Sequence, residues 1–245
     1  MISNWPYPRL VAHRGGGSLA PENTLAGFET GARYGAKMAE FDAKLSADGI
    51  AFLLHDDTVD RTSDGHGAAS DLTYDAIAEL DAGSWFDARF AGERMPTLAD
   101  VAALTQRLDM LVNIEIKPSS GRDEQTGARI ARDAQLLWQG RTPPLLSSFS
   151  ESALSAARRA APELPCGLLF GIVPDDWHER TRRLGCVSLH ARHDGLRAEL
   201  VAAIKAEGLR MMAYTVNELA RARQLARWGV DCICTDRIDL ITESL

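Results

Sequence analysis

The chain has 245 residues, and α/β barrels commonly reach this length as one domain. Its composition, 45% hydrophobic and 25% charged, excludes a disordered or fibrous protein. The net charge of −7 argues against nucleic acid as the main partner, because phosphate backbones require clustered lysine and arginine.

Short apolar, β-rich runs alternate with amphipathic helical stretches along the chain. The runs that we expect to be strands are residues 9–13, 38–45, 111–116, 144–148, 166–170, 186–190, 209–215 and 231–235. This alternation implies parallel strands joined by helical crossovers. Eight such strands favour an α/β fold of the (β/α)8 TIM-barrel type, with an open doubly wound sheet as the alternative.

Two helix boundaries are marked by capping residues. Thr97 and Asp100 have the spacing of a capping box and predict the start of a helix. Residues 217–228 carry a helical apolar stripe, with Asn217 as the predicted N-cap and Gly229 as the predicted end.

A hairpin is expected directly after the second strand. Asp48-Gly49 separates this strand from the apolar run 51–54, and this dipeptide is typical of a two-residue hairpin turn. That register places Asp42 directly opposite His55, with the two side chains on the same side of the hairpin. The prediction depends on loop length, because a three-residue loop shifts the register.

Residues 56–96 have weak periodicity and many turn-forming residues, together with the aromatic pair Trp85 and Phe86. We interpret this segment as an insertion over one end of the barrel, before the helix that follows the second strand. Residues 1–245 are therefore expected to form a single domain with one insertion.

The four cysteines lie in apolar, strand-like runs, and no pair has the two-residue gap of a zinc or redox motif. We expect them to be small buried side chains in a reducing compartment. The chain shows no basic, apolar leader and no apolar run of membrane-spanning length. These features predict a cytoplasmic protein with no membrane partner.

Acidic side chains gather where the second and third parallel strands end. Glu40 and Asp42 are two residues apart, as are Glu115 and Lys117, so each pair shares one face of its strand. Their neighbours, such as Ile114, are apolar and suit the helix-facing layer. Three inward carboxylates with one lysine require a further cation, which predicts a site for one divalent ion, Mg²⁺, Ca²⁺ or Mn²⁺. The alternative is that both strands turn these residues outward to solvent.

His13 ends the first strand and is followed by Arg14 and the glycines 15–17. Glycines allow a ligand to approach the backbone, and arginine binds phosphate oxygens in bidentate fashion. Together with His55, a cation and Lys117, this set suits phosphodiester cleavage. One histidine would deprotonate the attacking hydroxyl and the other would protonate the leaving oxygen, while the cations neutralise developing charge.

These residues form a series of motifs that spans the chain from Asn4 to about Asp239. The motifs are His13-Arg14-Gly15-Gly16-Gly17, Pro21-Glu22-Asn23-Thr24, Glu40-Phe41-Asp42, Asp48-Gly49, His55-Asp56, Arg61-Thr62, Asn113 to Pro118, Tyr214 to Asn217, and Thr235-Asp236. The series resembles the glycerophosphodiester phosphodiesterase family, most of all its bacterial cytosolic members associated with glycerol 3-phosphate uptake.

The resemblance implies a barrel with a small insertion that hydrolyses glycerophosphodiesters, such as glycerophosphocholine and glycerophosphoethanolamine, to sn-glycerol 3-phosphate and an alcohol. A route through a cyclic glycerol phosphate would fit two histidines. By motif position, the implied roles are acid–base catalysis for His13 and His55, metal binding for Glu40, Asp42 and Glu115, and phosphate contact for Arg14 and Lys117. Tyr214 stands where many relatives have tryptophan, and its ring is expected beside the glycerol.

Other functions fit parts of this pattern. A phosphate-binding barrel without catalysis would use Arg14 and the glycines but would not need two histidines. A Schiff-base aldolase would use Lys117, although Glu115 on the same face favours the charged form of that lysine. The sequence does not predict the oligomeric state.

Overall fold

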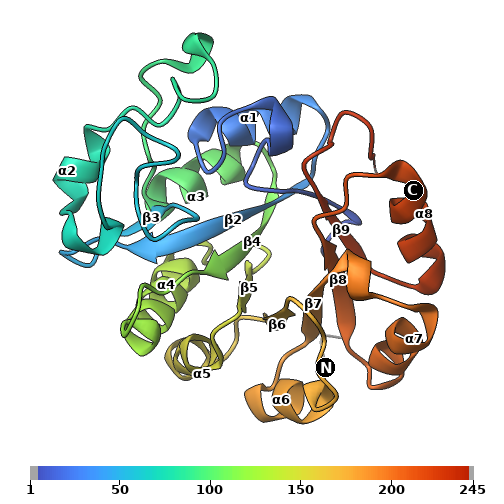
Figure 1. Cartoon of the computed structure of the whole chain (residues 1–245). Coiled ribbons are helices and arrows are strands. Elements are labelled where there is room, and N and C mark those ends of the chain that lie inside the picture. Colours follow the sequence, from blue (N-terminus) through green and yellow to red (C-terminus); the bar gives the residue numbers. More distant parts are fainter. Residues whose placement is uncertain (1–4, 243–245) are drawn as a thin grey trace.

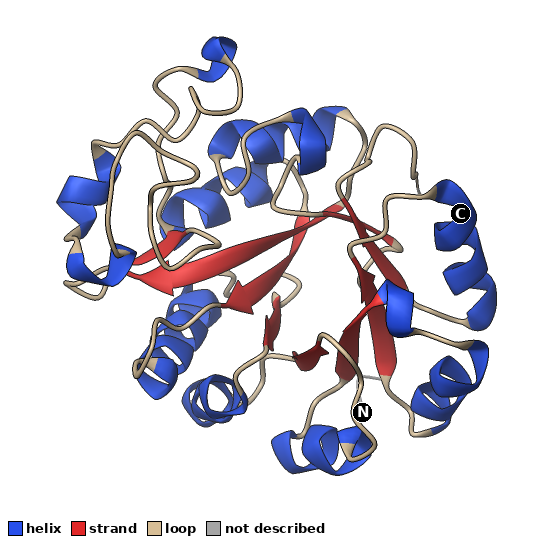
Figure 2. Ribbon diagram, viewed as in Figure 1, coloured by secondary structure: helices blue, strands red, loops and turns tan. Residues whose placement is uncertain are grey.

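The computed structural model describes residues 5–242, and within this range nine strands form one sheet (Figures 1 and 2). The strands are β1 (Leu10–Ala12), β2 (Met38–Leu45), β3 (Ala51–Leu53), β4 (Leu111–Ile116), β5 (Leu145–Ser148), β6 (Cys166–Phe170), β7 (Ser188–Arg192), β8 (Arg210–Tyr214) and β9 (Cys232–Thr235). Eight are parallel, and β1 pairs with both β2 and β9, which closes the barrel. The predicted (β/α)8 barrel is confirmed, and the open-sheet alternative is wrong.

Figure 2 shows the helices as an outer ring around the strands. The α-helices are α1 (Leu25–Arg33), α2 (Tyr74–Ala78), α3 (Leu98–Arg107), α4 (Asp123–Leu137), α5 (Glu151–Ala160), α6 (Trp177–Leu184), α7 (Ala198–Ala206) and α8 (Leu219–Trp228). Short 3₁₀ helices lie at Gly17–Leu19, Ala69–Asp71, Ala88–Phe90 and His193–Gly195. None of the helices in residues 5–242 combines the length and apolar character needed to cross a bilayer.

The apolar core has two layers. Residues such as Phe41 and Ile114 point from the strands toward the helices and are fully buried. Burial of each side chain of this kind contributes about 1.5–3 kcal/mol. Inside the barrel, Val11, Met38 and Met212 belong to a separate, smaller cluster. The interior positions nearer the C-terminal ends of the strands are therefore available for polar residues.

The capping predictions have different outcomes. Thr97 and Asp100 form the predicted capping box at the start of α3. Gly229 ends α8 in the left-handed conformation, with φ of 99°. Asn217 is not the N-cap of α8, because Glu218 occupies that position. The side chain of Asn217 instead contacts Asp236 beyond β9, and this long-range partner is invisible in local sequence.

The hairpin exists, but the predicted register is wrong by one residue. Leu45 pairs with Ala51, and the backbone N–H of Ser46 donates to the carbonyl of Ile50 at 3.0 Å. The loop thus has three residues and ends at Gly49, whose φ of 81° is the left-handed conformation that such a loop requires. Leu54, not His55, consequently lies opposite Asp42, and its N–H donates to the Asp42 carbonyl.

The segment of residues 56–96, the proposed insertion, lies between the hairpin and α3 and contains α2. It lies to one side of the barrel, next to α1 (Figure 1). It has its own apolar cluster, which includes Phe52, Val59, Ile77 and Met95. This cluster attaches the insertion to the hairpin, so that its loops have a fixed position near the barrel mouth.

The four cysteines form no disulfide in the described part of the chain. Cys166, Cys232 and Cys234 are buried, and Cys186 is half-buried. Their positions in or beside the strands agree with the expectation of small packed side chains.

Candidate active site

The three predicted metal ligands meet at the C-terminal end of the barrel. Asp42 and Glu115 are direct neighbours in the pairing of β2 with β4, and Glu40 is paired with Asn113 one pleat below. One carboxylate oxygen from each of the three acids lies within 4.8 Å of the others. Glu40 is 5% and Asp42 1% exposed, so the alternative in which these strands turn outward is wrong.

The electrostatics of the cluster fit a bound cation. Burial, together with the charge of Asp42, raises the pKa of Glu40 to about 7 and that of Glu115 to about 8. Oε1 of Glu115 is buried and accepts no well-aligned hydrogen bond, although Nζ of Lys117 lies 3.3 Å away. Three hard oxygen donors that are held close together without sufficient positive charge match the requirements of a divalent ion.

Asp42 is ionised and fixed in orientation. Although burial opposes its charge, Arg14, His55 and Lys117 lower the pKa of Asp42. Asn23 holds the residue from both sides: its amide N–H donates to Oδ2 at 3.0 Å, and its oxygen accepts from the Asp42 N–H at 3.1 Å. Asn23 adopts φ of 57°, a left-handed conformation that asparagine tolerates well.

His13 lies between two carboxylates. Its Nδ1 is 2.6 Å from Oδ1 of Asp236, and its Nε2 is 3.9 Å from Oε2 of Glu40. Burial opposes the charged imidazole, but the hydrogen bond to Asp236 and the charge of Glu40 raise the pKa of His13 overall. A carboxylate only accepts hydrogen bonds, so Nδ1 carries the proton of the neutral ring.

His55 has the same arrangement on the insertion side. Its Nδ1 lies 2.7 Å from Oδ1 of Asp56, which places the proton of the neutral ring on Nδ1. Burial lowers the pKa of His55, and the charge of Asp42 opposes this shift. The hairpin therefore delivers His55 beside Asp42 as predicted, although the register behind that prediction is wrong by one residue.

Arg14 follows His13 in a left-handed conformation, with φ of 51°. Its backbone N–H donates to Glu40 at 3.1 Å, and Nε of its guanidinium lies 3.4 Å from Oδ2 of Asp42. Gly17 has φ of 57°, and a Cβ atom at this position would lie 2.3 Å from the carbonyl oxygen of Asp236. Glycine is therefore required there for the turn after β1 to approach the residue after β9 this closely.

Arg61 connects the insertion to both sides of the site. It donates to both carboxylate oxygens of Glu22 at 2.8 Å and to Asp56 at 2.6 and 3.1 Å. Glu22 also accepts from Arg14 at 2.7 Å. One chain of charge-assisted hydrogen bonds thus extends from Arg14 to His55.

Four site residues were quoted in the sequence motifs without a role. Asp56 and Asp236 orient the two histidines. Glu22 accepts a hydrogen bond from Arg14, and Arg61 donates one to Asp56. For Asp56 and Asp236, the position directly after a histidine or a strand end was the available signal. Their partners lie far away in the chain, so sequence alone did not assign them.

Lys117 faces the carboxylates, as predicted. Nζ lies 3.3 Å from Oε1 of Glu115 and 3.9 Å from Oδ1 of Asp42. Burial opposes the charge, but both carboxylates raise the pKa of Lys117 overall. This is the opposite of the neutral amine that a Schiff-base mechanism requires, so the aldolase alternative has no support in the site.

Below the carboxylates a cavity of 30 Å³ is lined by residues including Glu40, Asn113, His190 and Tyr214. His190 is 1% exposed, and burial lowers its pKa to about 3, so it is a neutral interior residue. The hydroxyl of Tyr214 donates to the carbonyl of Phe170 at 2.8 Å, which directs the ring along the barrel wall.

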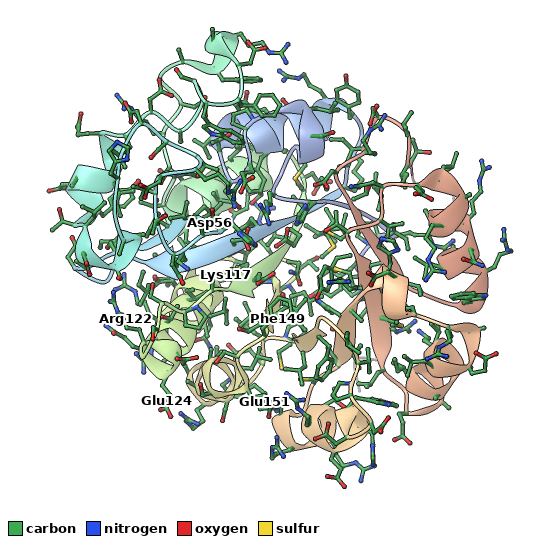
Figure 3. All side chains as sticks on the ribbon, in the orientation of Figure 1. Asp56, Lys117, Arg122, Glu124, Phe149 and Glu151 are labelled. Carbon is green, nitrogen blue, oxygen red and sulfur yellow. The ribbon has the colours of Figure 1, made fainter. Side chains whose placement is uncertain are left out.

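Two larger cavities open beside the two histidines. The lysine pocket, of 520 Å³, is lined by residues that include Lys44, His55, Asp57, Lys117, Ser148 and Phe149. The aromatic pocket, of 280 Å³, is lined by residues that include His13, Arg14, Glu22, Trp85, Phe86 and Asp236. In Figure 3, Asp56, Lys117 and Phe149 come from separate segments and lie around the central opening of the barrel.

The chain is similar to known proteins over most of its length. A model of the glycerophosphoryl diester phosphodiesterase family matches residues 13–240. The glycerophosphodiester phosphodiesterase of Caldanaerobacter subterraneus is 37% identical over 233 residues, which cover 93% of each chain.

Solved structures have the same architecture. A phosphodiesterase of Oleispira antarctica, in complex with its product sn-glycerol 3-phosphate, is 35% identical with a TM-score of 0.91, over 94% of this chain and 93% of that one. The glycerophosphodiester phosphodiesterase of Agrobacterium tumefaciens is 31% identical with a TM-score of 0.82, over 97% of this chain and all of that one, 100%.

Proposed function

The chain belongs to the glycerophosphoryl diester phosphodiesterase family, and we propose that it hydrolyses glycerophosphodiesters to sn-glycerol 3-phosphate and an alcohol with a divalent cation. The observation that carries this proposal is the pair of histidine–aspartate hydrogen bonds on either side of the carboxylate cluster. A phosphate-binding barrel without catalysis would have no use for two oriented imidazoles.

Glu40, Asp42 and Glu115 would hold the cation, which when bound supplies positive charge to the phosphate oxygens. Since both glutamates have raised pKa values, their full ionisation would accompany binding of the ion. The guanidinium of Arg14 and the ammonium of Lys117 lie on the same cluster and would contact the remaining phosphate oxygens.

The two imidazoles would move the protons. One Nε2 takes a proton from the attacking hydroxyl as its oxygen forms a new P–O bond, the P–O bond to the alcohol breaks, and the other Nε2, protonated beforehand, gives a proton to the leaving oxygen. Where the attacking hydroxyl is that of the substrate's own glycerol, water then opens the cyclic phosphate by the same proton transfers in reverse. The hydrogen bonds to Asp56 and Asp236 keep each ring in the tautomer with Nε2 available. General acid–base catalysis of this kind contributes about 10²–10⁴-fold to a rate.

We propose glycerophosphocholine and glycerophosphoethanolamine as substrates. The relative from Oleispira antarctica was solved with sn-glycerol 3-phosphate, the product common to both. The ring of Tyr214 packs edge-on against Phe149 of the lysine pocket, with ring centroids 6.2 Å apart, and from there it would contact the glycerol.

Release of glycerol 3-phosphate from glycerophosphocholine tests the proposal directly. We expect activity that EDTA removes and that Mg²⁺, Ca²⁺ or Mn²⁺ restores, with the most effective ion identifying the natural one. Activity that survives thorough chelation would contradict the metal site but not the substrate class. No turnover of any glycerophosphodiester with any of these ions would contradict the function itself.

We further propose that the whole chain acts as one domain in the cytoplasm. The reduced, packed cysteines support a reducing compartment, and the family match over residues 13–240 spans barrel and insertion alike. Fractionation of the native cells and a single cooperative unfolding transition would test these two statements.

A further inference from the structure

The aromatic pocket is bordered by a loop of the insertion whose shape is tightly determined. Asp81 accepts hydrogen bonds from the N–H groups of Gly83 at 2.8 Å and Gly92 at 2.9 Å, and from Ser84 at 2.7 and 2.8 Å. The carboxylate of Glu93 accepts from the N–H of Ala26 at 3.3 Å. The loop is therefore attached to the start of α1, directly beside the residues that follow His13.

Two aromatic rings are presented from this loop. The indole N–H of Trp85 donates to the carbonyl of Ala82 at 2.8 Å, which fixes the ring while leaving 38% of the residue exposed. Phe86 packs edge-on against Trp85 at 5.6 Å and against Phe90 at 5.7 Å. Trp85 and Phe86 both line the cavity that contains His13. The pocket thus has a preformed aromatic wall within reach of the catalytic centre.

We propose that the aromatic pocket holds the leaving alcohol of the substrate and selects an alcohol with a methylated ammonium group, as in choline. This inference rests on the proposed phosphodiesterase function. A quaternary ammonium group is attracted to the faces of aromatic rings, with tryptophan as the best partner. The carboxylates of Glu22 and Asp236 also line this pocket, but Arg14, Arg61 and His13 already pair with them, so the aromatic rings carry the proposed preference.

The lysine pocket is less suited to a cationic alcohol. Both pockets contain acidic and basic residues, so their net charge does not distinguish them. In the lysine pocket, however, the ammonium groups of Lys44 and Lys117 form part of the wall, and Phe149 is the aromatic residue there. The ammonium groups of Lys44 and Lys117 instead suit the oxygens of the glycerol phosphate half, which all substrates share.

Comparison of two substrates tests this assignment. Glycerophosphocholine and glycerophosphoglycerol share the glycerol phosphate half but carry a cationic and a neutral alcohol, respectively. For Trp85→Ala we expect kcat/KM for glycerophosphocholine to fall about 3- to 30-fold, the range of a cation–π contact, mainly through KM. For glycerophosphoglycerol we expect a change of less than about twofold, because a neutral alcohol makes no cation–π contact.

Three further variants serve as controls. Trp85→Phe retains a ring and should recover part of the preference for choline. Phe86→Leu provides a second test of the same wall if Trp85→Ala disturbs folding. Phe149→Ala, in the lysine pocket, should change both substrates to the same degree.

The assignment would be overturned if Trp85→Ala and Phe86→Leu changed both substrates equally or neither, or if Phe149→Ala alone changed their ratio. A wild-type protein that hydrolysed neither substrate would refute the proposed function itself. These outcomes are distinct, since the first two require an active wild-type enzyme.

Discussion

Arg61 offers a test of how the insertion contributes to catalysis. It does not face the carboxylate cluster, yet it joins Glu22 to Asp56, which in turn orients His55. Replacement with alanine removes all four of its hydrogen bonds to these two carboxylates. If Arg61 is a positioning residue, its loss should lower kcat while the fold survives.

The expected size of the effect follows from exposure and geometry. The Arg61 side chain is 43% exposed, and exposed ion pairs contribute about 0.2–1 kcal/mol each. Loss of about 1 kcal/mol lowers the Tm of a chain of this size by about 2–4 °C. In contrast, misplacement of a catalytic group by an ångström costs about 100-fold in rate. We therefore expect kcat to fall about 10- to 100-fold, well beyond the loss of stability.

The pH dependence separates orientation from charge. The hydrogen bond from Arg61, followed by His55, holds the pKa of Asp56 well below its ordinary value. Without Arg61 that pKa rises toward about 3.9, so Asp56 stays ionised at neutral pH. A loss of kcat at pH 7 would thus reflect orientation of His55. Because the pKa of Asp56 is lower in the folded state, its ionised form stabilises the fold at pH values above its pKa in the unfolded chain. The stability difference between wild type and variant should therefore shrink as the pH falls below about 4.

The assay is steady-state hydrolysis of glycerophosphocholine from pH 5 to 9, with thermal unfolding of the same samples. Arg61→Lys is the matched control, because lysine keeps the charge but lacks the planar fork that joins two carboxylates, and its kcat should be intermediate. Activity of Arg61→Ala within twofold of wild type would refute the positioning role. A rate loss that paralleled a large fall in Tm would refute it as well.

Three other predictions address the site itself. His13→Ala and His55→Ala should each lower kcat at least about 100-fold with the circular dichroism spectrum unchanged, and near-normal rates in both would rule out the two-histidine mechanism. Glu115→Gln should raise the cation concentration needed for half-maximal activity about 10-fold or more; unchanged metal dependence would remove Glu115 from the ligand set. Burial and the charge of Asp42 raise the pKa of Glu115 to about 8, so the ionised carboxylate opposes folding when no cation is bound. In EDTA near pH 8, Glu115→Gln should therefore have a higher Tm than the wild type. A lower Tm would contradict this explanation. Gly17→Ala should lower the free energy of unfolding by about 1–3 kcal/mol, because the new Cβ would lie 2.3 Å from the backbone oxygen of Asp236. The measurement is the midpoint of urea unfolding. An unchanged midpoint would show that the turn at Gly17 does not pack tightly against Asp236.

The sequence by itself determined the features that depend on local periodicity. A period of two along β2 and β4 put Glu40 and Asp42 on one face and Glu115 and Lys117 on one face, and the apolar neighbours favoured the inward orientation that burial in the structure confirms. The capping box at Thr97 was likewise readable, because donor and acceptor are three residues apart.

Tertiary structure alone decided the hydrogen bonds between distant segments. His13 and its partner Asp236 are 223 positions apart, and Arg61 and Glu22 are 39 apart. Closure of the barrel brings the first pair together, and packing of the insertion on the hairpin brings the second. Nothing in the local pattern of either segment identifies the other, because such contacts arise from the summed packing of the whole chain.

The hairpin shows where the two kinds of information meet. Asp48-Gly49 indicated a turn, but the dipeptide is compatible with loops of two or three residues. The choice of three residues and the shift in register depend on Ser46, whose backbone N–H bonds to Ile50, and on the pairing of β2 with β3. His55 still reaches the site because it lies beyond the paired residues, where the chain leaves the strand and the hydrogen bond to Asp56 sets the direction of the ring.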